Sequence, residues 1–202
     1  HDREVKLTKL THVSYDPYAL CPTWLKFLDQ IFLGDHELID YMQRLIGYSL
    51  TSDISEQLMV FLVGDGSNGK STFINTIKTL VGEYGMQVNS NTFIKKRDGG
   101  ANNDIARLAG SRFVSAIESE QGEELAESLV KQITGGEPIT ARFLRQEYFE
   151  FIPEFKVFFT TNHKPVIKGA DNGIWRRIKL IPFNLRLPKE QADLKLPEKL
   201  SL

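Results

Sequence analysis

The residues with the clearest chemical potential are GDGSNGKST, residues 64–72, which follow the apolar run LMVFLV. They fit the pattern GxxxxGK[ST], with Gly64, Gly69, Lys70 and Ser71 in the fixed positions. Glycines let backbone N–H groups curl around phosphate oxygens, and the start of a following helix adds positive dipole. Lys70 is then expected to reach the β- and γ-phosphates of a nucleotide, and Ser71 to give its hydroxyl to Mg²⁺. The predicted phosphate-binding loop consists of Gly64, Asp65, Gly66, Ser67, Asn68, Gly69, Lys70, Ser71 and Thr72.

Polar residues at the ends of two further apolar runs complete the candidate chemistry. RFVSAIESE supplies Glu118 and Glu120, either of which could orient an attacking water, and Glu118 is the candidate second ligand of Mg²⁺. FKVFFTTN ends in Asn162, whose neutral amide can touch both water and a γ-phosphate. The alternatives are that the glutamates are solvated surface charges and that Asn162 closes a turn before His163.

Positive charge gathers in the second half of the chain and has two distinguishable uses. In WRR, Arg176 or Arg177 could reach the γ-phosphate of a neighbouring subunit as an arginine finger. Arg142 and Arg145 flank a predicted hairpin, and Arg145 at its tip could contact a DNA backbone. Solvated surface charge is the expectation for Lys156, Lys168 and Lys179.

The elements that must position these residues alternate between helical and extended patterns. Helical spacing covers residues 24–32 and, after a capping Asp35, a second segment that could weaken or end at Gly47. A buried strand over 57–63 precedes the glycine loop, and helical spacing returns over 73–82. Other expected elements are strands at 112–117, 155–161 and 174–181, a helix over 123–133, a hairpin between 135 and 153, and a mobile loop over 89–103. This alternation predicts an α/β fold with a mainly parallel central sheet.

Composition limits the classes of protein that need to be considered. The chain has 202 residues, 41% of them hydrophobic, which suits one soluble core with a small helical appendage. No apolar run is long enough for a membrane helix. The single cysteine, Cys21, excludes an internal disulfide framework, and we expect it to be a small packed side chain. Because the net charge is −1, a polyanionic partner must be met by local positive charge.

Taken together and in order, the runs GDGSNGKST, IESE, VKQITGGEPITARFL, FFTTNHKP and DNGIWRRIKLIPF resemble those of the superfamily 3 helicases. The sequence looks most like the primase-helicases of phages, plasmids and large DNA viruses, and the match runs from Tyr15 to Phe183. The resemblance implies an AAA+ P-loop NTPase core and assembly into a homo-hexameric ring. It further implies an enzyme that uses ATP and Mg²⁺ to move along single-stranded or forked DNA during replication of such a genome.

The same resemblance suggests roles for individual residues. It makes Lys70 and Ser71 the phosphate-loop pair, Glu118 the acid of the second motif and Asn162 the sensor. Either Arg176 or Arg177 would be the finger that acts on the next subunit, and either Glu118 or Glu120 the key acid. Lys131 lies where related motors place a basic residue facing the neighbour's nucleotide. The basic residues expected to bind DNA are Arg145, Arg142 and Lys131.

The predicted organisation is a helical region over 1–52, the ATPase core over 53–184 and a charged, truncated C-terminal tail over 185–202. Family members usually carry a primase domain on the same chain, and a host cytoplasm is the expected location. Two other functions stay open. One is a P-loop phosphotransferase acting on a small substrate, whose arginines would act within one subunit. The other is a DNA-binding scaffold that nucleotide merely locks, with negligible turnover.

Overall fold

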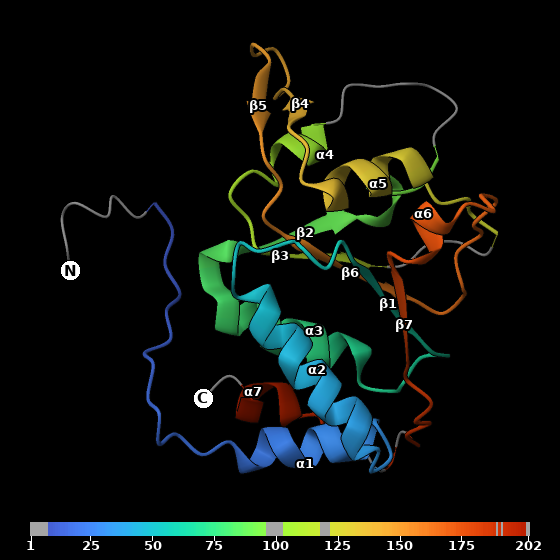
Figure 1. Ribbon diagram of the computed structural model, residues 1–202. Coiled ribbons are helices and arrows are strands. Elements are labelled where there is room, and N and C mark those ends of the chain that lie inside the picture. The colour runs from blue at the N-terminus through green and yellow to red at the C-terminus, as the bar shows by residue number, and fades with distance from the viewer. Residues whose placement is uncertain (1–7, 96–102, 118–121, 189, 191, 201–202) are drawn as a thin grey trace.

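The computed structural model describes residues 8–95, 103–117, 122–188, 190 and 192–200 (Figure 1). Among these described residues, no helix is long and apolar enough to cross a membrane.

A five-stranded sheet forms the centre of the molecule. Its strands are β1 (Met59–Val63), β2 (Gly85–Asn89), β3 (Phe113–Ile117), β6 (Lys156–Thr161) and β7 (Ile178–Pro182). They lie in the order β2-β3-β6-β1-β7, and every neighbouring pair is parallel. The three inner strands β1, β3 and β6 are almost wholly buried, as a parallel sheet covered on both faces requires. The predicted α/β fold with a parallel sheet is therefore confirmed.

Helices cover both faces of this sheet (Figure 1). One layer holds α1 (Pro22–Ile31), α2 (His36–Ser49), α3 (Lys70–Val81) and α7 (Leu196–Leu200). The other layer holds α4 (Asn103–Ala106), α5 (Glu127–Gly135) and α6 (Asn172–Trp175). Short 3₁₀ turns occupy Gly82–Tyr84 and Ser90–Thr92. The side chains of β1 alternate between the two faces of the sheet. Val60 and Leu62 pack in the core on the side of α1, α2 and α3, and Met59 and Phe61 pack in the core on the side of α4, α5 and α6.

Between α5 and β6, the predicted hairpin is present as β4 (Ile139–Ala141) paired antiparallel with β5 (Phe149–Phe151). It projects beyond the α4 and α5 layer, away from the central sheet (Figure 1). Asp35 also has its predicted place, because its carboxylate caps α2 by accepting from the backbone N–H of Leu38 at 3.0 Å.

Several local expectations were wrong. The first part of the predicted mobile loop over 89–103 is ordered: it begins as a strand end and a 3₁₀ turn, followed by the buried Phe93 and by Ile94, which pairs with Leu125. Residues 96–102 of that loop lie outside the described residues. Helix α2 continues through Gly47 to Ser49. Cys21 is exposed, since it lies at the start of α1 on the surface.

Lys156 was expected to be a solvated surface charge, but the structure buries it. Its ammonium donates to the carbonyl oxygen of Thr51 at 2.6 Å and lies 4.3 Å from the centre of the Tyr48 ring. Arg112 beside it donates to the carbonyl oxygen of Leu50 at 2.7 Å. Both cations therefore meet the carbonyl end of α2, where the helix dipole is negative. Burial lowers the pKa of Lys156 to about 8.

Candidate functional site

The glycine loop joins β1 to α3, as the sequence pattern requires. Gly66, Ser67 and Gly69 have φ values of 84°, 47° and 88°, so the backbone turns through the left-handed region before α3 begins at Lys70. Gly69 needs to be glycine for a second reason, since a Cβ atom there would lie 2.6 Å from Cγ2 of Ile31 on α1. The loop is thus shaped by backbone conformations and by its contact with α1.

Lys70 lies folded onto the loop, with 7% of its surface exposed. Its ammonium donates to the carbonyl oxygen of Gly64, to Oδ1 of Asn68 at 3.1 Å and to Oδ1 of Asn162 at 3.3 Å. Asn68 is buried and donates in turn to the carbonyl oxygen of Phe183 at 3.1 Å. A ring of oxygen atoms around an ammonium group is the arrangement that phosphate oxygens can replace.

A cavity of 360 Å³ lies beside this lysine. Its walls are the loop residues 66–72, the end of β3 at Ile117 and the end of β6 from Thr160 to Asn162. The structure thus brings the predicted phosphate loop and the predicted sensor to one cavity at the carboxyl edge of the sheet. Ser71 is exposed in the first turn of α3. Glu118 and Glu120 lie outside the described residues, although Glu118 follows directly after Ile117 in the chain.

A second, mainly apolar cavity of 300 Å³ adjoins the first. The two cavities share Ser67, Gly69 and Thr72 as wall residues. The apolar part of the wall comes from α1 and from the segment after β7: Phe27, Ile31, Leu185, Leu187, Leu194 and Leu196. Sequence reasoning missed the four leucines, because it assigned residues 185–202 to a charged tail. The signal was the spacing of leucines among the charges.

A third cavity of 470 Å³ lies between the start of the loop and the end of β7. Lys164 and the exposed pair of Asp65 with Arg186, 2.8 Å apart, contribute to its wall. It shares no wall residue with the cavity at Lys70, so it is less directly connected to the candidate phosphate site.

The two arginines of WRR lie beside the amino-terminal ends of the strands, whereas the loop lies at their carboxyl-terminal ends. The backbone N–H of Met59, the first residue of β1, donates to the carbonyl oxygen of Arg177 at 2.8 Å, whereas the loop follows the last residue of β1. The length of β1 therefore separates them, and five extended residues span about 16 Å. Arg176 is exposed and donates to Oε1 of Gln57 at 2.6 Å. Arg177 is buried, with 7% of its surface exposed.

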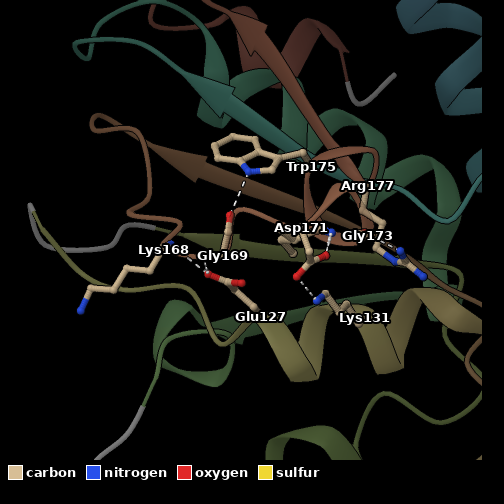
Figure 2. Close-up of polar contacts among 9 residues, drawn as sticks. Glu127, Lys131, Lys168, Gly169, Asp171, Gly173, Trp175 and Arg177 are labelled. Atoms are coloured by element: carbon tan, nitrogen blue, oxygen red, sulfur yellow. Dashed lines mark hydrogen bonds and ion pairs between the residues drawn. The ribbon is translucent and has the colours of Figure 1, made fainter.

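Lys131 comes from α5 and contacts the segment that leads to WRR (Figure 2). Its ammonium lies 2.7 Å from Oδ2 of Asp171, and this bond lowers the pKa of that carboxyl group. Lys131 also lines a groove of 630 Å³ together with Gln57 and Arg177. The structure thus places Lys131 near the WRR segment.

Arg142 and Arg145 belong to the connection between β4 and β5, and both are exposed. The guanidinium of Arg142 lies 4.7 Å from the centre of the Tyr148 ring, and Arg145 has a φ of 62°. Leu144 and Tyr148 are 74% and 63% exposed, so the tip combines positive charge with uncovered apolar and aromatic surface. Such a combination suits contact with single-stranded nucleic acid.

Comparison with known proteins finds relatives that are named as putative helicases and primases of large DNA viruses. A family profile described as "Family of unknown function (DUF5906)" matches residues 62–177. "Putative helicase L207/L206" of Acanthamoeba polyphaga mimivirus is 32% identical over 82% of this chain and 17% of its own length. "Putative helicase 022R" of Frog virus 3 is 29% identical over 63% of this chain and 14% of its own length. "Putative primase C962R" of African swine fever virus is 25% identical over 89% of this chain and 19% of its own length. The chain thus spans less than a fifth of each of these relatives.

Solved structures support the fold. The NrS-1 C-terminal region superimposes with a TM-score of 0.64 at 14% identity, over 91% of this chain and 43% of that one. A JCV helicase superimposes with a TM-score of 0.53 at 13% identity, over 83% of this chain and 46% of that one. The predicted resemblance to viral primase-helicases is confirmed by the relatives, and the arrangement of strands and helices by these structures.

Proposed function

The chain belongs to the family described as "Family of unknown function (DUF5906)", and on that premise we propose that it is the ATP-driven motor of a superfamily 3 DNA helicase. It hydrolyses ATP at the interfaces of a ring of identical subunits and moves along single-stranded DNA during replication of a viral or mobile genome. The names of its relatives support the helicase and primase context.

The observation that carries this proposal is the separation of Arg176 from the phosphate loop. The two lie at opposite edges of the sheet, about 16 Å apart along β1, so one subunit cannot bring the arginine to its own nucleotide. A second copy in a head-to-tail contact can supply the arginine, and repeating that contact closes a ring. The same separation argues against a phosphotransferase that completes its site within one chain.

Within one subunit, we place the phosphates of ATP in the cavity beside Lys70. There the loop N–H groups and the start of α3 hold the β- and γ-phosphates, and Ser71 and Glu118 would hold Mg²⁺. The ion would neutralise charge on the phosphates, while the side chain of Asn162 orients the attacking water. The adenine fits the adjoining apolar cavity, which shares walls with the phosphate cavity, better than the cavity between the loop and β7, which shares none.

DNA contact is assigned to the β4–β5 hairpin. Arg145 and Arg142 supply charge for phosphates, and the exposed Tyr148 offers a face for base stacking. A ring repeats this tip around its axis, so that a subunit with a net charge of −1 can still present a strongly positive channel.

Mixing two inactive variants tests the proposal. Lys70→Ala removes the phosphate contact but keeps the arginine, and Arg176→Ala does the reverse. We expect neither to hydrolyse ATP alone. An equal mixture should recover about a quarter of the wild-type rate, since one interface in four pairs an intact loop with an intact arginine. The wild-type rate per subunit should also rise with protein concentration and with single-stranded DNA.

The opposite result has a clear meaning. A wild-type rate that is strictly linear in protein concentration, together with a mixture that stays inactive, would show that sites do not form between subunits. Nucleotide binding without turnover under every condition would favour the scaffold.

A further inference from the structure

The sequence leaves Arg176 and Arg177 as equal candidates for the finger, but the structure gives them different surroundings. We propose that Arg177 is a positioning residue, which fixes the segment 168–177 on α5 so that Arg176 is held at the subunit edge. This inference rests on the proposed function, and it assigns different work to two adjacent arginines.

The contacts of Arg177 are those of a buried structural cation. Its Nε donates to Oγ1 of Thr134 on α5 at 2.9 Å. Its Nη1 donates to the carbonyl oxygen of Gly173 (Figure 2). Thr134 is itself buried and donates to the carbonyl oxygen of Val130 at 2.7 Å. With two polar partners and little exposed surface, Arg177 could reach a neighbouring subunit only by leaving a satisfied buried position, which is costly.

Other contacts hold the same segment on the same helix. Oε1 of Glu127, in the first turn of α5, accepts from the backbone N–H groups of Lys168 and Gly169 at 2.9 and 2.8 Å. Any side chain at Gly169 would collide with that carboxylate, since a Cβ atom would lie 2.1 Å from Oε2. Oδ1 of Asp171 caps α6 by accepting from the N–H of Ile174 at 3.1 Å, and Oδ2 bonds Lys131.

Trp175 forms a bond within the segment 168–177, because its indole N–H donates to the carbonyl oxygen of Gly169 at 2.9 Å (Figure 2). The segment is therefore attached to α5 at its start through Glu127, in its middle through Asp171 and at its end through Arg177. Arg176, which stands between Trp175 and Arg177 in the chain, is exposed, and the one hydrogen bond described for its side chain is that to Gln57. A fixed backbone that carries one exposed cation is the geometry that a finger acting on a second subunit requires.

The mixing assay assigns the defect to one side of the interface. Thr134→Val removes the acceptor of Arg177 Nε with little change of shape. Placed in the Lys70→Ala subunit, which donates the arginine, it should lower the recovered hydrolysis about tenfold, because Arg176 is displaced. Placed in the Arg176→Ala subunit, which donates the loop, it should leave the rate unchanged.

Thr79→Val in the arginine-donating subunit is the matched control, because the Thr79 hydroxyl also donates to a carbonyl one turn back, that of Asn75, on an exposed helix face. It should leave the recovered rate unchanged. Equal loss from Thr134→Val on both sides of the interface would indicate general destabilisation and overturn the proposal. Full activity of Thr134→Val and Arg177→Met on the arginine-donating side would overturn it as well.

A spectroscopic measurement tests the positioning role without hydrolysis. With Trp24→Phe as background, Trp175 is the remaining tryptophan and reports on the segment itself. Thr134→Val and Arg177→Met should increase quenching of its fluorescence by acrylamide, whereas Arg176→Met should not. Equal quenching in all variants would refute the positioning role, even if mixed subunits hydrolyse ATP. Increased quenching with no recovery in the basic mixing assay would instead leave the positioning role standing and refute the trans-acting motor.

Discussion

Replacing Asn162 with aspartate should weaken nucleotide binding by an amount that can be worked out from the structure. Asn162 Oδ1 lies 3.3 Å from Lys70 Nζ at the wall of the phosphate cavity. A full negative charge at that distance would attract the ammonium by about 5 kcal/mol at an effective dielectric constant of about 20. The same charge would repel a triphosphate in the cavity. Because the side chain of Asn162 is exposed, solvent screening reduces the effect, and we expect a net loss of about 2 kcal/mol, a roughly thirtyfold weaker affinity.

The assay is titration with a fluorescent, non-hydrolysable ATP analogue at low and high salt. Asn162→Ala is the matched control, because it removes the amide without adding charge. It should bind the analogue within about threefold of wild type, yet hydrolyse ATP about a hundredfold more slowly, since a polar group that acts on the reacting phosphate is lost. If Asn162→Asp bound the analogue as tightly as wild type at low salt, Asn162 would not face the phosphates and the assigned sensor role would be wrong.

Three further predictions concern other parts of the molecule. Gly64→Ala should lower the free energy of unfolding in urea by about 1–3 kcal/mol, because the new Cβ would lie 2.2 Å from the backbone oxygen of Phe183; an unchanged midpoint would contradict this contact. The stability of wild type relative to Lys156→Met should rise with pH between about 8, the lowered pKa of Lys156, and its ordinary 10.5, because the unfolded chain binds more protons in that range; a flat or falling difference in denaturant titrations would refute the burial. Arg145→Gly, which suits the φ of 62°, should preserve stability while weakening single-stranded DNA binding and reducing its salt slope by about one charge; unchanged DNA affinity would remove this residue from the channel.

The phosphate loop and the hairpin could be predicted because each depends on local sequence. A buried strand, a glycine loop and a helix in succession specify the turn at Gly69 without knowledge of the rest of the chain. The hairpin follows equally from two short extended runs around a polar tip. Strand β2 could not be predicted in this way, because GMQVN is short, half-polar and stabilised by pairing with β3 at the edge of the sheet.

The positions of the charged side chains were harder to predict than the elements. Lys156 is buried because the fold brings the start of β6 to the carbonyl end of α2, about a hundred residues earlier in the chain, and no local pattern encodes that meeting. The burial of Arg177 could not be predicted, because the sequence suggested a strand over 174–181, whereas residues 172–175 form the short helix α6 and Arg177 follows its C-cap. The structure buries Arg177 and leaves its neighbour Arg176 exposed.

The contact between Gly69 and α1 has a thermodynamic consequence for the chain. Ile31 and Phe27 occupy the space where a side chain at position 69 would lie, so one helix forms the outer wall of the phosphate loop. Under the proposed function, any free energy of nucleotide binding that is used to order the loop is therefore shared with the docking of α1. Linkage is reciprocal: docking of α1 changes the affinity for nucleotide by the same factor by which bound nucleotide changes the docking equilibrium of α1. If the loop binds nucleotide as proposed, loop and helix act as one binding element, although about forty residues separate Gly69 from the contacting residues of α1 in the sequence.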